Sequence, residues 1–169
     1  MRQRGFSLSE FMLALTIASI TLAMVLPPIL RAIDVENEKN QINSAVSNIF
    51  DGMSLALTMH WQRVQCRSAP ILTLTDLIND YGVPANVNAN YAPRITFVSA
   101  PTAPYNARSL RVTLNAPTEN AAQNLSHALN TQGRWLTITG KQITLTQPIA
   151  VIDSLSEHMN YNPKNGCLN

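Results

Sequence analysis

An uncharged stretch of twenty residues near the N-terminus, from Phe11 to Leu30, constrains this chain more than any other feature. As a helix it would extend about 30 Å at 1.5 Å per residue, which is the thickness of the hydrocarbon core of a bilayer. Its only hydroxyl side chains are Thr16, Ser19 and Thr21. Charged residues make up 13% of the whole chain, about half their usual share in soluble domains. The stretch therefore predicts a membrane helix.

A cleaved secretory signal peptide is the alternative for such a segment. Its apolar region should span about 7–15 residues and end in a small-x-small cleavage site. This segment is longer and ends in Leu26-Pro27-Pro28-Ile29-Leu30-Arg31, so a membrane anchor is favoured. Arg2 and Arg4 precede it, and basic flanks favour a cytoplasmic N-terminus. The rest of the chain is then expected across the membrane, in the periplasm of a Gram-negative cell.

Glu10 stands at the edge of this stretch, where a carboxylate is unfavourable. Moving it into hydrocarbon costs on the order of 2.5–3.5 kcal/mol or more unless the charge is paired, so such a residue is functional by default. The alternative is a carboxylate that simply lies at the level of the lipid headgroups. The residue taken alone favours neither interpretation.

The segment Gly5-Phe6-Ser7-Leu8-Ser9-Glu10 resembles the cleavage and methylation signature of type IV pilins and the related pseudopilins. In that family a short basic leader ends in Gly, the mature chain begins with Phe, and a Glu follows at the fifth mature position. The resemblance implies that a prepilin peptidase cuts after Gly5 and that Phe6 becomes an N-methylated terminus. It also implies that Glu10 pairs with the cationic N-terminus of a neighbouring subunit. Glycine before the cut lets a protease approach the backbone closely.

A second helical pattern follows from Asp34 to about Gln65. Apolar residues recur there mostly at three- and four-residue steps, as on one face of a helix. We expect one long helix, kinked or broken at Pro27-Pro28 because two backbone donors are missing. Its second half should be amphipathic and covered by a sheet, with Gly52 as a weak point and Pro70 as the latest end. The stripe consists of Val35, Ile42, Val46, Ile49, Met53, Leu57 and Val64.

The remaining chain alternates between short elements, so the fold class is predicted as α+β and pilin-like. The long N-terminal helix, half membrane-spanning and half amphipathic, packs on an antiparallel sheet of about four strands with one extra helix in the sheet region. Gly140-Lys141 joins the last two strands in a hairpin. Helices are expected at 73–81 and 118–130, a loop at 83–93, and strands at 94–99, 109–115, 134–139 and 142–146.

Three parts are predicted along the chain: a leader peptide at 1–5, a hydrophobic transmembrane and assembly helix at 6–33, and a globular pilin-like domain at 34–169. The two cysteines, Cys66 and Cys167, lack CxxC-type spacing, so they do not indicate a zinc site. In an oxidising compartment they predict one disulfide. Two separate buried thiols are the alternative.

Catalytic and metal-binding patterns are not found in the sequence, so an enzyme, a cofactor or a metal is not predicted. His60, His127 and His158 occur singly, and His60 is interpreted as a packed or rim residue. The pairs Asp76/Asp80 and Asp153/Glu157 are each four residues apart. Either could offer carboxylates to calcium, which some pseudopilins bind, but two oxygens fall far short of about six to eight. Solvated helix faces are favoured.

The resemblance favours a structural filament subunit, a minor pilin involved in pilus assembly or pilus-mediated adhesion. A pseudopilin of a type II secretion system is the alternative. A subunit at the pilus tip that binds a ligand or DNA is also compatible, and Arg94, Arg108, Arg111 and Arg134 motivate it against solvated strand edges. Expected partners are other pilins, prepilin peptidase, the inner-membrane assembly machinery and membrane lipid, with nucleic acid left open. The precursor should cross the inner membrane once before it enters a pilus or pseudopilus.

Overall fold

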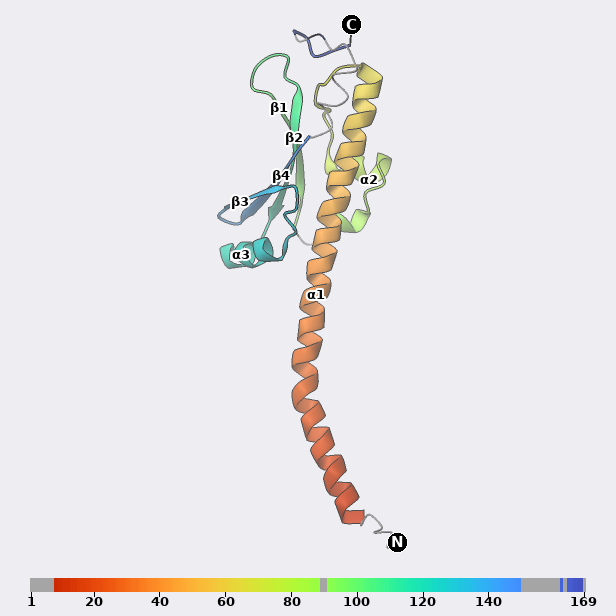
Figure 1. Cartoon of the computed structure of the whole chain (residues 1–169), viewed down its shortest axis with the longest axis vertical. Coiled ribbons are helices and arrows are strands. Elements are labelled where there is room, and N and C mark those ends of the chain that lie inside the picture. Colours follow the sequence, from red (N-terminus) through yellow and green to blue (C-terminus); the bar gives the residue numbers. More distant parts are fainter. Residues whose placement is uncertain (1–7, 89–90, 150–161, 163, 169) are drawn as a thin grey trace. The chain divides into compact units, whose positions relative to one another are not determined.

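The structure is a computed structural model that describes residues 8–88, 91–149, 162 and 164–168. The chain divides into two compact units, one ending at Asn40 and the other beginning at Gln41. Helix α1 (Leu8–Val64) belongs to both (Figure 1). The other elements are α2 (Leu74–Asp80), the 3₁₀ helix η1 (Ala85–Asn88), β1 (Arg94–Ser99), β2 (Ala107–Asn115), α3 (Glu119–Ala128), β3 (Trp135–Thr139) and β4 (Gln142–Pro148).

In the first unit, α1 continues without interruption through Pro27 and Pro28. The predicted break at this pair is therefore wrong. Each proline removes one backbone donor, but its ring also holds its own φ near the helical value. The helix therefore continues through this pair although two of its backbone hydrogen bonds are missing there.

Four strands form one antiparallel sheet in the order β1-β2-β4-β3, within the second unit. This confirms the predicted α+β architecture. β1 has the predicted bounds, β2 begins two residues earlier than predicted, and β4 ends two residues later. The predicted hairpin is β3–β4, in which Thr139 faces Gln142 across the turn. The loop predicted at 83–93 is wrong in part, because residues 85–88 form η1.

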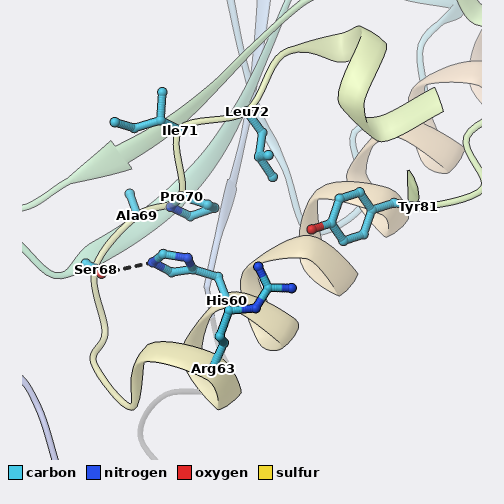
Figure 2. A pocket seen from close by; sticks show the side chains of 8 residues that line it. All are labelled: His60, Arg63, Ser68, Ala69, Pro70, Ile71, Leu72 and Tyr81. Carbon is cyan, nitrogen blue, oxygen red and sulfur yellow. Dashed lines mark hydrogen bonds between the residues drawn. The ribbon is translucent and has the colours of Figure 1, made fainter. Parts of the chain in front are cut away.

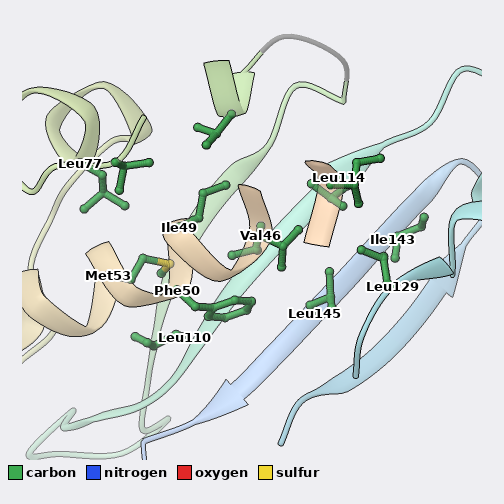
Figure 3. Close-up of a cluster of buried hydrophobic side chains, with 14 of the residues drawn as sticks. Val46, Ile49, Phe50, Met53, Leu77, Leu110, Leu114, Leu129, Ile143 and Leu145 are labelled. Atoms are coloured by element: carbon green, nitrogen blue, oxygen red, sulfur yellow. The ribbon is translucent and has the colours of Figure 1, made fainter. Parts of the chain in front are cut away.

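The core lies between the sheet and the second half of α1, and α2 packs on the other side of that helix (Figures 1 and 3). The sheet covers the predicted stripe from Ile42 to Leu57, whereas Val35 and Val64 are 66% and 43% exposed. Phe50, which is not part of the stripe, is fully buried. The largest fully buried side chains are Phe50, Ile49, Met53, Leu77, Leu110, Ile143, Leu145 and Val112.

Gly52 has a packing role in α1 and is not merely a weak point in the helix. A β-carbon at this position would collide with Cγ2 of Val83, in the segment that follows α2. The helix and that segment approach so closely that only hydrogen fits between them. The lower helix propensity of glycine is the cost of this contact.

Candidate functional site

The surface of α1 between Phe11 and Leu30 is apolar on all sides. Its large hydrophobic side chains between Leu8 and Ile33 are 46–78% exposed, and no described residue covers them. Among the residues that the structure describes, α1 is the helix that is long and apolar enough to cross a membrane, judged by length and composition. Apolar area of this extent is unfavourable in water and needs lipid or neighbouring helices around it.

The three hydroxyl side chains in this surface are satisfied within the helix. Thr16 Oγ1 donates to the Leu13 carbonyl at 2.8 Å, and Ser19 Oγ donates to the Thr16 carbonyl at 2.9 Å. Thr21 Oγ1 donates to the carbonyls of Ile17 and Ala18 at 3.0 and 2.9 Å. Polar groups in hydrocarbon must be paired internally, so these residues are compatible with an apolar environment.

The predicted processing residues, Gly5 and Phe6, precede this helix in the sequence. Gly5 and Phe6 are outside the described residues. Glu10 is in the first turn of α1, which begins at Leu8. The residues that would carry cleavage and assembly are thus followed directly by the apolar surface.

A family model described as the prokaryotic N-terminal methylation motif matches residues 1–26. This chain carries the type IV prepilin signature. The match spans the basic leader, Gly5, Phe6, Glu10 and most of the uncharged stretch. No curated protein and no solved structure matches the chain significantly.

The prepilin signature implies processing by prepilin peptidase and assembly into pili with other pilins. Together with the apolar N-terminal helix it describes a membrane-anchored pilin-like or pseudopilin-like subunit that later enters a filament. An exposed apolar surface of this kind is compatible with both states, because lipid or the helices of other subunits can cover it.

Cys66 and Cys167, which are 101 positions apart in the sequence, form a disulfide. This is the pair that the sequence predicts. Next to it, the Arg67 N–H donates to the Gly166 carbonyl at 3.0 Å, and the Ala107 N–H donates to the Arg67 carbonyl at 2.8 Å. The segment after α1 thus lies between the C-terminal residues and the start of β2. The disulfide joins two of these segments, and the hydrogen bond from Ala107 to Arg67 joins the third.

A pocket of about 350 Å³ lies beside the last turns of α1. Within it, His60 Nε2 and Ser68 Oγ are 3.0 Å apart, and Arg63 and Tyr81 flank the opening (Figure 2). None of its lining residues is acidic, so the His–Ser pair has no carboxylate to orient it as a triad would. The pair holds the segment after the helix in place. The lining residues are His60, Arg63, Ser68, Ala69, Pro70, Ile71, Leu72 and Tyr81.

The contribution of His60 should make the stability of the fold depend on pH. Burial, followed by the charge of Arg63, lowers the pKa of His60 below its ordinary value of 6.5. The unfolded chain therefore binds the proton more readily, so stability is complete above about pH 6.5 and falls as the pH drops through the lowered folded pKa. We expect the melting temperature to fall less between about pH 7.5 and 5 in His60→Gln than in the wild type. Equal falls would contradict this contribution.

The four arginines predicted as a possible ligand surface do not share one environment. Arg94, Arg108 and Arg111 are exposed on β1 and β2. Arg134 is half-buried, with its guanidinium carbon 4.4 Å from the centre of the Phe50 ring and its Nε donating to Gln147 Oε1 at 3.0 Å. The interpretation of Arg134 as a ligand-binding or solvated edge residue is therefore wrong. It packs the sheet against α1 through a cation–π contact.

The acidic pair Asp76/Asp80 is not a free ligand set. The Asp76 carboxylate accepts from the N–H and the hydroxyl of Thr73 at 2.7 and 2.8 Å, which closes a capping box at the start of α2. These hydrogen bonds from Thr73 lower the pKa of Asp76. The second pair, Asp153 and Glu157, lies outside the described residues, as does His158.

Proposed function

We propose that this chain is a minor pilin, a structural filament subunit that takes part in pilus assembly or pilus-mediated adhesion and is not an enzyme. The observation that carries the proposal is the methylation motif at residues 1–26 in front of a helix whose apolar side chains are exposed. A catalytic role would need an oriented set of reactive side chains in a pocket, whereas the His60–Ser68 pair holds the segment after α1. A pseudopilin shares the same N-terminal features. A tip subunit that binds a ligand or DNA stays a prediction.

The proposed division of the chain into functional segments follows from the cleavage site after Gly5. Residues 1–5 form the leader, 6–33 the transmembrane and assembly helix, and 34–169 the globular domain. Phe6 is methylated after cleavage, and Glu10 pairs with the N-terminus of a neighbouring subunit. The globular domain faces the periplasm before assembly, because Arg2 and Arg4 keep the leader in the cytoplasm. That compartment oxidises the Cys66–Cys167 pair.

Processing at the Gly5–Phe6 bond is the expected result that tests the proposal. Mass spectrometry of the filament fraction should give a chain that begins at Phe6 with an added methyl group. Gly5→Leu should leave an uncut precursor in the membrane, because a bulky side chain keeps the protease from the backbone. Leu8→Ile, a change of shape beyond the cut, is the matched control and should be cleaved normally. Assembled filaments with chains that begin at Met1 would contradict the proposal.

Minor pilin and pseudopilin are separated by the phenotype of a deletion strain. Loss of surface pili with normal secretion supports the pilin. Loss of secretion with normal pili would show instead that the chain is a pseudopilin.

A further inference from the structure

β3 is an edge strand of the sheet, and the hydrogen bonds of the hairpin show which of its backbone groups face outward. The Ala116 N–H donates to the Lys141 carbonyl, and the Ile149 N–H donates to the Arg108 carbonyl. The odd-numbered residues of β4 therefore bond to β2, and its even-numbered residues bond to β3. Within β3 the bonded residues are Trp135, Thr137 and Thr139, which face even-numbered residues of β4.

The backbone groups of Leu136 and Ile138 thus point away from β4, toward the open edge. In the part of the chain that the structure describes, no strand pairs with this edge. The side chains of both residues belong to the inner face of the sheet, opposite Leu145 and Ile143. Ile138 is nevertheless 40% exposed, whereas Ile143 beside it is fully buried. The apolar layer is incomplete along β3.

Protective features that usually keep an edge strand from pairing are missing in β3. Natural edges carry charges, proline or a bulge. The sequence of β3, Trp135–Thr139, has no charge and no proline, and its register with β4 is regular. The opposite edge differs, because β1 begins with the exposed Arg94 and its register shifts between Val98 and Ser99.

We propose that β3 pairs with β3 of a second copy of this chain, antiparallel and centred on Thr137. In this register Leu136 faces Ile138 of the other copy. Because the contact is two-fold symmetric, Ile138 also faces Leu136 of the other copy. Both are hydrogen-bonded pairs that use the outward backbone groups, so four hydrogen bonds form. Leu136 and Ile138 of the second copy extend the apolar layer over the exposed Ile138. Because the strand is uncharged, the copies meet without repulsion.

The symmetry of this contact sets it apart from filament assembly. A two-fold contact uses the same surface on both subunits, whereas the subunits of a helical filament are joined head to tail through different surfaces. The pairing therefore links two anchored subunits in the membrane, or two filaments, and does not depend on Phe6 or Glu10. Two strands of five residues bury less than the roughly 1,200–2,000 Å² of a stable interface. The contact is weak and relies on local concentration in the membrane.

Cysteine cross-linking of the full-length protein in membranes tests the register. At the two-fold centre, Thr137 faces itself as a non-hydrogen-bonded pair with Cα atoms about 4.5 Å apart, within disulfide range. Thr139 is equally exposed on the same face, but it faces Trp135 of the other copy and lies about 14 Å from the other Thr139. We expect at least tenfold more oxidised dimer from Thr137→Cys than from Thr139→Cys. The native cysteines are already joined, so they do not compete.

Equal dimer yields would overturn the proposal, because association through the membrane helix or random collision brings both positions together alike. No dimer from either variant would also overturn it. A second pair of variants tests the contact in the absence of oxidant. Thr137→Lys places two charges opposite each other and should reduce the dimer in membranes at least tenfold, as measured by energy transfer between fluorescent labels on the full-length protein. Thr139→Lys should leave the dimer unchanged, and an equal loss in both would overturn the register.

Discussion

Glu10→Val is expected to enter the membrane and to be cleaved after Gly5, yet to be absent from sheared filaments. Cleavage creates a free amine at Phe6, four residues before Glu10. Within one straight helix the two groups are about 6 Å apart along the axis, which is too far for close contact without distortion. The amine of a neighbouring subunit, displaced along the filament, can come closer. Each charge would then be neutralised inside a core of apolar helices.

The expected effect is large because only one partner of the pair is removed. A buried charge that loses its partner costs about 3–5 kcal/mol, which corresponds to a loss of incorporation of about two to four orders of magnitude. Removal of both charges would cost much less, so the pair serves subunit register more than stability. Membrane insertion should not change, because valine is more favourable than glutamate in hydrocarbon.

Immunoblots of sheared filaments and of membranes measure the two steps separately. Thr16→Val is the matched control, because the Thr16 hydroxyl already bonds to the carbonyl of Leu13 in its own helix and needs no partner from another subunit. This variant should be incorporated like the wild type. Incorporation of Glu10→Val at the wild-type level would show that Glu10 is only a carboxylate at the headgroup level.

Local signals in the sequence predict most elements of this fold. The alternation in residues 94–99 gives the bounds of β1, and Gly140-Lys141 identifies the β3–β4 hairpin. Thr73 and Thr118 cap α2 and α3, at the starts of the helices predicted at 73–81 and 118–130. Each of these signals operates within a few residues, so tertiary packing does not alter it.

Features that depend on distant segments could not be predicted in this way. Gly52 appears as a helix-weakening residue until the close approach of Val83 is known. Arg134 resembles a surface cation because its partner Phe50 lies on another element. Asn43 likewise bonds the end of α3, accepting from the Asn130 N–H at 2.7 Å and donating to the Ala128 carbonyl at 2.9 Å. These contacts join residues far apart in sequence.

The residues of the candidate site also fall into two groups, those that a local sequence signal indicates and those that depend on contacts between distant segments. The cleavage and assembly residues form a contiguous motif, so the sequence alone indicates them. The pocket at His60 required the structure, because Ser68 and Tyr81 reach it from beyond the end of α1. A lone histidine in a helix gives no signal of such a partner. The open edge of β3 is also hidden in the sequence, since strand order determines which strand lies at an edge.

Removal of the disulfide is expected to destabilise the globular domain more than any other change outside the core. Cys66 and Cys167 are 101 positions apart in the sequence, and in the chain-entropy model a link that closes a loop of this size contributes up to about 4.7 kcal/mol to the free energy of unfolding. The Leu168 N–H also donates to the Gln65 carbonyl at 2.8 Å. This hydrogen bond is easily lost once the C-terminal residues are free, because chain ends fray.

The double variant Cys66→Ser/Cys167→Ser should therefore unfold at a clearly lower denaturant concentration than the wild type, measured by tryptophan fluorescence of the full-length protein in detergent. Reduction of the wild type should produce a similar loss, because it releases the same constraint. Reductant should not affect the double variant, which makes that variant the control for other effects of the reagent. Thiol labelling of the denatured, unreduced protein gives an independent measure. Two free thiols per chain, or equal unfolding midpoints for wild type and variant, would contradict the predicted constraint.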